Sequence, residues 1–564
     1  MAKKKKLSQP IPAWAKYAWW VIPVLAILVY IPAFDADFTL DDVLIVEDNE
    51  YIKSADKLPR LWTTHYWAGK MDASDTGLYR PLTLTSYAIQ YITLGDNPVP
   101  FHVLNILLHA LTCFILMKFV KLLFNDNRLA ILSGLIFAIH PVHTEAVAGI
   151  VGRAEIMASL FILLSGICYH HWKRTGNLKW LGGLIVSTFA AITSKEHGFM
   201  IPLILGLQET TYYLSVKKYQ WSSGRTWLAI GSVMLVAIIL WIIRSAVTGP
   251  SVPHEEWLHV NAMDRMATSV RITFEYIGMH LFPLKLSADY WSKEVPVVGW
   301  GNFSVIVALF SAIALLGIAV WQRNRMRSFS WGIFFFFLTL APVSNFLFAA
   351  GFLKAERILY IPSIGLIVAI SALLVKLYDT KNLKILAIGL AGAFTLFFIA
   401  RTWVRAGDWK NNYTLAEATL KVSPDSPRFN NMMGLELRAL GQNQEALSFF
   451  EKAVKGNPNH VPALVNLGTE YKTFNRPAEA AATLERALEI DPNTLATYVN
   501  LMSIYRSMEN HDKSLEVAKK AVARFPQSAA VLWNAANAYQ LKNDMVRANE
   551  LRARARAIQP DIGM

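Results

Sequence analysis

Carboxylates crowd into one short stretch that directly follows the first apolar segment of the chain. Within 14 residues the stretch holds Asp35, Asp37, Asp41, Asp42, Glu47 and Asp48. Crowding by like charges and partial withdrawal from water raise the proton affinity of a carboxylate, which then suits it to accept a proton from a hydroxyl group. The pattern is compatible with general-base chemistry at a membrane edge. From spacing alone, a solvated acidic loop is the more common case.

A second polar group follows the apolar segment that ends near residue 139. It contains His140, His143 and Glu145, and a few residues later Arg153 and Glu155. Two imidazoles and a carboxylate this close are a conceivable metal site. Because Pro141 breaks the helix between the histidines and no further ligand cluster is evident, we instead expect hydrogen-bonding residues at the membrane edge and no metal.

Two more charged sets lie beside apolar segments. They are Lys195 with Glu196, and Lys354 with Glu356 and Arg357. Ionisable residues at such a depth are costly and usually functional. A Lys or Arg there is suited to hold the phosphate of a lipid whose tail stays in the bilayer. The alternative is an internal ion pair between sequence neighbours, Lys195 with Glu196 or Glu356 with Arg357.

Composition identifies the elements that must position these residues. Hydrophobic residues make up 54% of the 564 residues and charged residues 17%, which is too apolar for a chain of soluble domains. The apolar residues come in blocks of about 18 to 25, the length of a helix that crosses a bilayer. The chain is therefore expected to be a polytopic membrane protein.

The formal charge of +14 does not indicate nucleic-acid binding. From Glu417 onward, 18 Lys and Arg face 16 Asp and Glu, so the basic excess belongs to the apolar part of the chain. It lies in the run Lys3 to Lys6 and in short clusters between apolar blocks, where basic residues mark the cytoplasmic side. The two cysteines, Cys113 and Cys168, both lie inside apolar segments, which excludes a disulfide framework.

With a cytoplasmic amino terminus, eleven segments alternate across the membrane. They lie near 17–34, 101–122, 129–149, 155–171, 178–194, 198–215, 226–246, 303–321, 330–349, 358–377 and 383–402. The first is expected to be a retained span, a cleaved signal peptide being the alternative. The segment Val270 to Leu284 carries Arg271, Glu275 and His280, so we expect it to lie in the outer interface. An odd number of spans places the rest of the chain outside, together with the acidic loop.

The last quarter of the chain repeats every 34 residues. The prolines Pro424, Pro458, Pro492, Pro526 and Pro560 keep this interval, as do alanines and tyrosines. This is the length of a tetratricopeptide helix-turn-helix repeat. We expect full repeats at 427–460, 461–494, 495–528 and 529–562, preceded by a half repeat at Asp408 to Val422. The fold class is thus all-α, with a membrane domain at 1–405 and an α-solenoid at 406–564.

One column of the repeats has no packing explanation. Asn466, Asn500 and Asn534 recur at the same interval on the expected first helices. Asparagine is a poor helix former, but its amide both donates to and accepts from a peptide backbone. A row of such amides would hold an extended acceptor polypeptide without reading its sequence. The alternative is that each makes a local hydrogen bond that is common in such repeats.

Several motifs resemble one known family. "HPVHTEAVAGIVGRAE" (His140 to Glu155), "TSKEHG" (Thr193 to Gly198), "LSADYW" (Leu286 to Trp291), "AERILYIPSIG" (Ala355 to Gly365) and the Asp-Asp pair followed by "YRPLT" (Tyr79 to Thr83) are similar to the transmembrane and tetratricopeptide-repeat-containing protein O-mannosyltransferases. Their order and spacing also match. The resemblance covers nearly the whole chain and implies a C-type membrane glycosyltransferase fold.

The resemblance implies transfer of a hexose, mannose being expected, from a polyprenyl phosphate to Ser or Thr hydroxyls of an extracytoplasmic polypeptide. Asp41 matches the catalytic acid of the first outer loop, and Asp42 is its neighbour. A basic clamp would hold the departing phosphate, with these candidates in order: Arg357, Lys195 and Arg153, then Lys354. Residues expected to bind substrate or to support the site are His140, His143, Glu145, Glu155, Glu196, Tyr79 and Arg80.

No cofactor is implied beyond the lipid-linked sugar, which is a co-substrate. The array of four full repeats is shorter than in animal members, which implies a different or smaller acceptor. It also favours a bacterial inner membrane with periplasmic repeats, the endoplasmic reticulum membrane being the alternative. The competing functional class is a non-catalytic membrane scaffold or a transporter, in which the repeats would assemble a complex. A transporter is expected to carry its charged residues near mid-membrane, whereas here they flank the outer ends of apolar segments.

Overall fold

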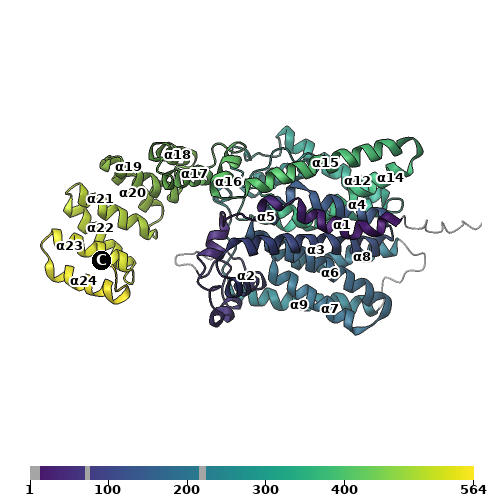
Figure 1. Ribbon diagram of the computed structural model, residues 1–564, viewed down its shortest axis with the longest axis horizontal. Coiled ribbons are helices and arrows are strands. Elements are labelled where there is room, and N and C mark those ends of the chain that lie inside the picture. Colours follow the sequence, from purple (N-terminus) through teal and green to yellow (C-terminus); the bar gives the residue numbers. More distant parts are fainter. Residues whose placement is uncertain (1–12, 70–76, 215–223, 292, 564) are drawn as a thin grey trace, which may run out of the picture. The chain divides into compact units, whose positions relative to one another are not determined.

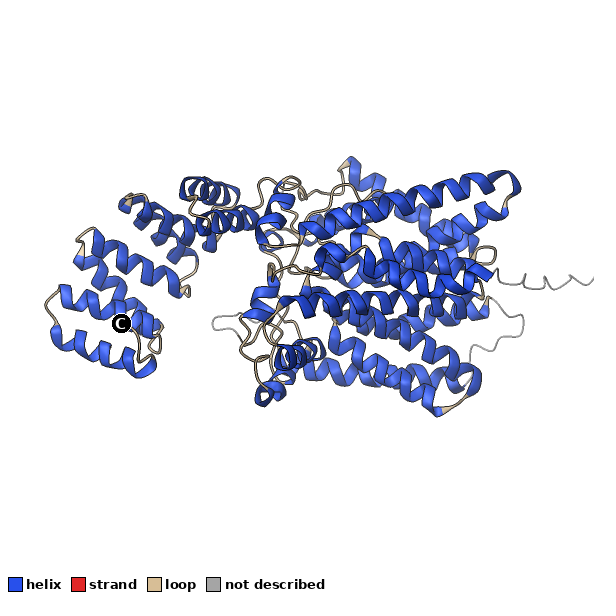
Figure 2. Cartoon of the chain, viewed as in Figure 1, coloured by secondary structure: helices blue, strands red, loops and turns tan. Residues whose placement is uncertain are grey.

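The computed structural model describes residues 13–69, 77–214, 224–291 and 293–563. In these ranges the chain is helical and contains no β-strand (Figure 2). It divides into two compact units, residues 1–415 and 416–564, which are described separately below. The basic run Lys3 to Lys6 lies outside the described residues. So do Lys217 and Lys218, which belong to one of the short basic clusters predicted to lie on the cytoplasmic side.

The first unit is a stack of helices, most of them long (Figure 1). They are α1 (Ala13–Leu28), α2 (Pro81–Leu94), α3 (Pro98–Phe124), α4 (Asn127–Ile139), α5 (Thr144–Ala148), α6 (Arg153–Thr175), α7 (Leu178–Ser194), α8 (Ile201–Tyr213), α9 (Gly224–Val247), α10 (Glu255–Leu258), α11 (Ala262–Leu281), α12 (Phe303–Gln322), α13 (Arg327–Leu340), α14 (Tyr360–Asp379) and α15 (Lys384–Asp408). Among the packed pairs are α6 with α7, α13 with α14, and α3 with both α4 and α6.

Six helical segments among the described residues are long and apolar enough to cross a membrane, or seven if a bent pair counts as one span. The six are 98–124, 150–175, 224–247, 303–322, 357–379 and 381–408, and the bent pair joins 127–139 to 141–148. Helices also occupy the other predicted spans, but they are shorter. The number eleven therefore stays a prediction. The segment predicted to lie in the interface is part of α11, which begins earlier, at Ala262, and is not among the six.

Short polar signals set the boundaries of these helices. Asn97, Asp126, Asn177 and Asn302 are N-caps whose side chains accept backbone N–H groups of the first turn of α3, α4, α7 and α12. At the other end, Asn125 and Gly176 adopt positive φ after α3 and α6. A side-chain acceptor satisfies a backbone donor that has no partner within the helix, and a left-handed residue ends the helix. Capping residues in the sequence thus mark where one apolar helix ends and the next begins.

The first outer loop of the predicted orientation, residues 35–100, is folded in its described part and has a core of its own. A 3-10 turn (Ile31–Ala33), a π-helical turn (Val43–Glu47), a 3-10 helix (Ala55–Trp62) and α2 follow one another. Buried side chains from these elements pack into one cluster: Ile45, Val46, Ile52, Leu61, Tyr66, Leu84, Tyr87 and Ala88, joined by Phe101 and Ile150. The acidic stretch is therefore held by packing, and its carboxylates occupy defined positions.

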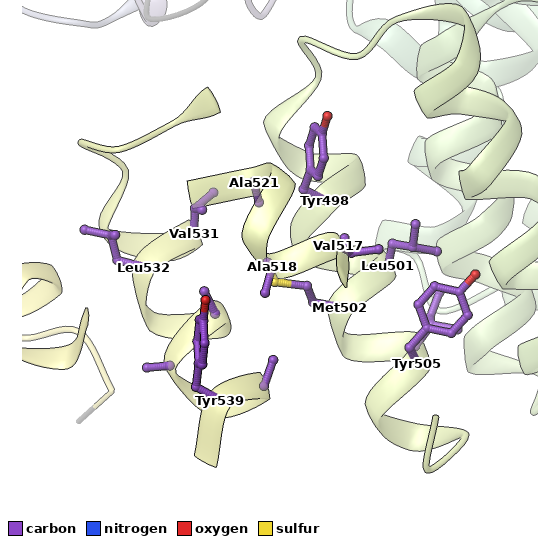
Figure 3. Packing of buried hydrophobic residues seen from close by; sticks show 14 of the residues in the cluster. Tyr498, Leu501, Met502, Tyr505, Val517, Ala518, Ala521, Val531, Leu532 and Tyr539 are labelled. Carbon is purple, nitrogen blue, oxygen red and sulfur yellow. The ribbon is translucent and has the colours of Figure 1, made fainter. Parts of the chain in front are cut away.

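The second unit is a row of helix pairs. Helices α17 (Pro427–Ala439), α19 (Val461–Thr473), α21 (Leu495–Ser507) and α23 (Ala529–Leu541) are each followed by a partner, α18 (Asn443–Gly456), α20 (Pro477–Ile490), α22 (His511–Arg524) or α24 (Met545–Ile558). The first helices begin 34 residues apart, in the register of the sequence repeat. Figure 3 shows Tyr498, Leu501 and Met502 in the cluster that fills the space between α21, α22 and α23.

Small residues allow the two helices of a repeat to approach closely. A Cβ on Gly434 would lie 2.5 Å from a side-chain carbon of Phe450, and one on Gly468 would lie 2.7 Å from the Leu484 side chain. The later repeats carry the buried Met502 and Ala536 at this place. A larger side chain at Gly434 or Gly468 would therefore have to displace the Phe450 or Leu484 side chain that faces it.

The segment between the apolar helices and the full repeats differs from the prediction. We expected one repeat helix over Asp408 to Val422. Instead α15 continues to Asp408, and a separate helix, α16, spans Asn412–Leu420. Residues 409–411 form a turn in which Asn411 Oδ1 accepts the N–H of Thr414. The side-chain cap at Asn411 thus starts the predicted helix four residues later than expected.

Candidate active site

A carboxylate and a guanidinium from distant parts of the chain meet beside a buried glutamate. The Arg357 side chain lies 4.0 Å from Asp41 Oδ2 and 2.8 Å from Glu145 Oε1. Glu145 Oε2 also accepts the backbone N–H groups of Glu356 and Arg357, at 3.0 and 2.8 Å. The side chain of Glu145 is 3% exposed, whereas those of Asp41 and Arg357 are 16% and 31% exposed. Glu145 thus orients the arginine, and the side chains of the arginine and Asp41 are both partly exposed.

Three local breaks in helices bring these residues together. The helix predicted at 129–149 is interrupted at Pro141, and its two halves are bent by 54°, because proline cannot continue the hydrogen-bonded ladder. The bend places Glu145 on the short helix α5. Arg357 lies in the 3-10 turn Arg357–Leu359 just before α14. Asp41 lies just before the π-helical turn of the first outer loop.

Asp42 differs from Asp41 although the two are adjacent. Its side chain is buried, and it accepts the N–H groups of Thr39, Ile150 and Val151, the last at 2.8 Å, and the Thr39 hydroxyl. Burial raises the pKa of Asp42 to about 7, against the lowering effect of these hydrogen bonds. Asp42 therefore ties the first outer loop to the segment before α6.

A second charged layer lies next to Arg357. Arg80 makes a forked contact with Glu196, with Arg80 Nη2 at 2.8 Å from Glu196 Oε2. Burial opposes ionisation of Glu196, but the Arg80 guanidinium outweighs it and lowers the pKa of Glu196 to about 2. Lys195 is 7% exposed and contacts the buried Glu155. Burial, reinforced by Arg80, lowers the pKa of Lys195 well below its ordinary value.

The ion pairs differ from the neighbour pairs considered in the sequence. Lys195 pairs with Glu155 and Glu196 with Arg80, so the adjacent residues 195 and 196 point to different partners. Likewise Arg357 pairs with Glu145, whereas Glu356 lies 3.8 Å from Arg405 and accepts the Tyr290 hydroxyl at 2.7 Å. Burial raises the pKa of Glu356 to about 7, with Arg405 opposing the shift. Successive residues leave a backbone in different directions, which favours contacts with other elements.

Other predicted site residues are held within the protein. Arg153 has no exposed surface, and its guanidinium donates to Asn105 Oδ1 at 2.7 Å, to Gln90 Oε1 at 2.8 Å and to the Phe101 carbonyl. This position does not fit the phosphate-binding role expected for Arg153. The Lys354 ammonium lies 2.8 Å from Glu275 Oε2 and 4.5 Å from the centre of the Tyr290 ring. It therefore already pairs with a carboxylate of α11.

The two histidines belong to the interior. His140 Nε2 donates to the His280 carbonyl, since its Nδ1 accepts the Val142 N–H. His143 Nδ1 donates to the Phe137 carbonyl, and its Nε2 lies 2.8 Å from Ser363 Oγ. Both side chains are buried. The Tyr79 hydroxyl donates to the Trp62 carbonyl and thereby braces the first outer loop. In the described part of the chain, no group of three or more His, Cys, Asp or Glu side chains is placed to hold a metal ion.

Two residues near the site were not singled out from the sequence. Arg405, in the last turns of α15, is fully buried and contacts Glu356 and Asp408. A basic residue near the end of an apolar helix is a recognisable signal, because burial of a charge is costly. Asn412 gives no such signal. Its side chain accepts the backbone N–H of Leu40, 372 residues earlier.

The asparagine column is partly buried in the repeat unit and already makes contacts there. Asn466 donates to Asn431 Oδ1 of the preceding first helix at 2.9 Å, and Asn500 donates to Thr469 Oγ1 at 3.1 Å. Asn534 donates to the Ala530 carbonyl in its own helix. These local bonds match the alternative considered in the sequence analysis. Each uses one N–H of an amide that has two N–H groups and an accepting oxygen.

Comparison with known proteins gives one family match. Residues 437–504 match the family described as tetratricopeptide repeat. Crystal structures of MamA are among the similar solved structures. One is 21% identical, covers 26% of this chain and 80% of that chain, and has a TM-score of 0.24.

Curated relatives cover much more of the chain. Protein O-mannosyl-transferase TMTC3 from Homo sapiens is 26% identical over 461 residues, which is 76% of this chain and 50% of that protein. Protein O-mannosyl-transferase TMTC4 from Mus musculus is 28% identical over 496 residues, 78% of this chain and 66% of that protein. The chain thus spans about half to two thirds of the length of these relatives. Over three quarters of its own length, the chain is similar to proteins named protein O-mannosyl-transferases.

Proposed function

We propose that this chain is a membrane glycosyltransferase that moves a hexose, with mannose as first candidate, from a polyprenyl phosphate to Ser or Thr hydroxyls of a polypeptide outside the membrane. The observation that carries the proposal is the Asp41 carboxylate beside the Arg357 guanidinium that Glu145 orients. The carboxylate is suited to accept a proton, and the guanidinium is suited to bind a phosphate. The names of the relatives support the reaction class.

The reaction is a single displacement at the anomeric carbon. The acceptor hydroxyl oxygen attacks this carbon while its proton passes to Asp41. The bond between the carbon and the phosphate oxygen breaks, and polyprenyl phosphate leaves with the electron pair. Arg357 stabilises the added charge on the phosphate, so no general acid is required. The lipid-linked sugar is the co-substrate, and the proposal includes no cofactor.

The roles of the neighbouring carboxylates follow from their surroundings. Both oxygens of Asp42 accept backbone N–H groups, and the side chain is 1% exposed. Asp41 is partly exposed and faces the arginine. We therefore assign proton acceptance to Asp41 and positioning to Asp42. Arg80 and Glu196 are assigned to the wall of the same site, together with the paired Lys195 and Glu155.

Donor binding must open the contact between Asp41 and Arg357. In a single displacement, the reacting sugar carbon lies between the base and the departing phosphate. In inverting glycosidases, where the substrate carbon and the attacking water also lie between two side chains, the two carboxyl groups stand roughly 6.5 to 9.5 Å apart. The side chains of Asp41 and Arg357 are only 4.0 Å apart. The phosphate would thus compete with Asp41 for the guanidinium and release the carboxylate to accept a proton.

The reaction is tested with purified full-length protein, polyprenyl-phosphate mannose and Ser/Thr peptides. Wild-type protein should release polyprenyl phosphate and form mannosylated peptide. Asp41→Asn should lower the rate at least about 100-fold, because the amide cannot accept the proton. The matched control is Asp35→Asn, an exposed acid of the same loop, which should keep the wild-type rate. No release with any hexose donor, or release that survives Asp41→Asn, would contradict the proposal.

We further propose eleven spans, with the amino terminus in the cytoplasm and the repeats outside, most simply in the periplasm of a bacterial inner membrane. Single cysteines introduced at Asp56 and Lys381, both exposed, would probe the two faces in a background in which Cys113 and Cys168 are replaced by Ala. In intact spheroplasts, an impermeant maleimide should label position 56 and not position 381. The reverse pattern, or equal labelling, would overturn this orientation.

A further inference from the structure

One short stretch, residues 405–412, contacts both halves of the candidate site. At its start, the buried Arg405 lies 3.8 Å from Glu356, the residue directly before Arg357. At its end, the Lys410 carbonyl accepts the Asp37 N–H at 2.8 Å, and Asn412 Oδ1 accepts the Leu40 N–H at 3.1 Å. The acidic loop and the arginine segment thus rest on the same piece of chain.

The contact made by Asn412 falls on an unusual backbone position. Leu40 has φ of +51°, in the left-handed region. A side chain with a Cβ is disfavoured there, so such a conformation persists only where its surroundings hold it. Leu40 is also directly before Asp41. The conformation of Leu40 therefore sets the direction in which the Asp41 carboxylate leaves the loop.

The backbone is held on both sides of Asp41. After it, Asp42 accepts the N–H groups of Ile150 and Val151 at 3.2 and 2.8 Å. Before it, the hydrogen bond from Leu40 N–H to the Asn412 side chain joins the loop to the start of α16. Loss of the bond at Leu40 leaves the Asp37 N–H, four residues before Asp41, to attach this side of the loop to the 405–412 stretch.

We propose that Asn412 is a positioning residue for Asp41. This inference rests on the proposed function, because it assigns Asn412 a share in the step in which Asp41 accepts a proton. The amide oxygen holds Leu40 in its left-handed conformation, and the carboxylate is thereby kept beside Arg357. Without that acceptor, Leu40 relaxes toward the usual φ and the carboxylate turns away. Donor binding is retained, since Arg357 and Glu145 are untouched, and it is favoured where the Asp41 carboxylate no longer competes for the guanidinium.

The central comparison is between Asn412→Leu and Asn412→Asp. Leucine has nearly the same size but no acceptor, and it should lower kcat about tenfold while the KM for the lipid-linked sugar does not rise. Aspartate keeps the accepting oxygen and should keep kcat within about twofold at the optimal pH. The control is Lys410→Ala. The Lys410 side chain is exposed, and only its carbonyl contacts the loop, so wild-type kcat is expected.

A second-site change tests the backbone argument. Glycine adopts positive φ without the penalty of a Cβ, so Leu40→Gly in the Asn412→Leu background should recover kcat to within about threefold of wild type. Hydrogen exchange of the peptide spanning residues 37–43 supplies a readout that does not depend on activity. Exchange at Leu40 should rise in Asn412→Leu and not in Lys410→Ala.

The outcomes separate this inference from the function on which it rests. If wild-type protein transfers sugar and Asn412→Leu has wild-type kcat, or if KM rises as much as kcat falls, Asn412 does not position Asp41. Slow exchange at Leu40 in Asn412→Leu would also refute the hydrogen bond as the cause. If wild-type protein transfers no sugar while exchange at Leu40 behaves as expected, the proposed function fails. The hydrogen bond of Asn412 then holds Leu40 but positions no catalytic base. Should Asn412→Leu not fold, Asn412→Ala carries the same expectation without added bulk.

Discussion

At the scale of single residues, burial separates two neighbouring carboxylates into two roles. Asp41 is partly exposed beside a guanidinium, and Asp42 is buried among backbone N–H groups. The sequence presents them as equivalent members of an acidic run. Only their partners distinguish a group that is open to a substrate from a group that holds the loop in place.

The environment of Asp42 predicts a pH dependence of stability. Its folded-state pKa is raised by burial to about 7, whereas an unfolded Asp titrates near 3.9. Between these values the folded state binds the proton more tightly, so the contribution of Asp42 to stability is full below about pH 4 and is lost as pH rises through 7. The loss amounts to about 4 kcal/mol at most.

Thermal unfolding of wild type and Asp42→Asn between pH 4 and 8 measures this contribution. The variant cannot titrate at this position, so its unfolding temperature should rise relative to that of wild type as the pH increases. Asp35→Asn, at an exposed position of the same loop, should show no such trend. Parallel curves for wild type and Asp42→Asn would show that the folded-state pKa is not raised.

At the scale of elements, the site depends on close helix contacts as much as on its charges. Helices α13 and α14 approach through Gly332 and Gly365, where a Cβ on either residue would lie 2.3 Å from the carbonyl oxygen of the other. Small residues allow such an approach between membrane helices, where packing is a principal driving force. Helix α14 directly follows the turn that carries Arg357, so this contact helps to place the arginine.

Gly365→Ala should therefore destabilise the first unit by about 1–3 kcal/mol, because the neighbouring atoms are backbone and cannot rotate away. The variant should unfold at a lower temperature and transfer sugar more slowly. Gly317→Ala in α12 is the matched control, since no atom outside its own helical surroundings lies within 4 Å of the added Cβ. Equal unfolding temperatures for the two variants would show that α13 and α14 can separate without cost.

At the scale of the whole molecule, binding of a polypeptide acceptor by the asparagine column of the repeats stays a prediction. The prediction requires that replacing Asn466, Asn500 and Asn534 together by Ala weakens acceptor binding at least about tenfold and leaves donor binding unchanged, because alanine offers no amide to a peptide backbone. The KM for a peptide acceptor and the KM for the donor measure this separately. Asn459→Ala, at an exposed turn outside the column, is the control. An unchanged KM for the acceptor would leave the asparagines with their local hydrogen bonds alone.

Several features of the fold could be predicted because they are local in the chain. The lengths of the apolar blocks indicated membrane-crossing helices, and the 34-residue interval indicated helix pairs beginning at 427, 461, 495 and 529, where the structure has them. The break at Pro141 also followed from residue type. The helix expected over Asp408 to Val422 begins later, at Asn412, because α15 continues to Asp408 and Asn411 caps the new helix. Its place as half of a repeat stays a prediction.

Some features of the candidate site could likewise be predicted from the sequence, and others could not. The sequence by itself determined which charged residues flank the apolar segments, because a charge beside a membrane helix is conspicuous in any pattern of hydrophobicity. Tertiary structure decided which of them meet: Arg357 with Glu145, 212 residues away, Glu196 with Arg80, and Leu40 with Asn412. It also decided that Arg153 is enclosed and that Asp42 is buried. These outcomes depend on the directions in which side chains leave their helices and on the packing of distant segments, and neither is encoded in the spacing of neighbouring residues.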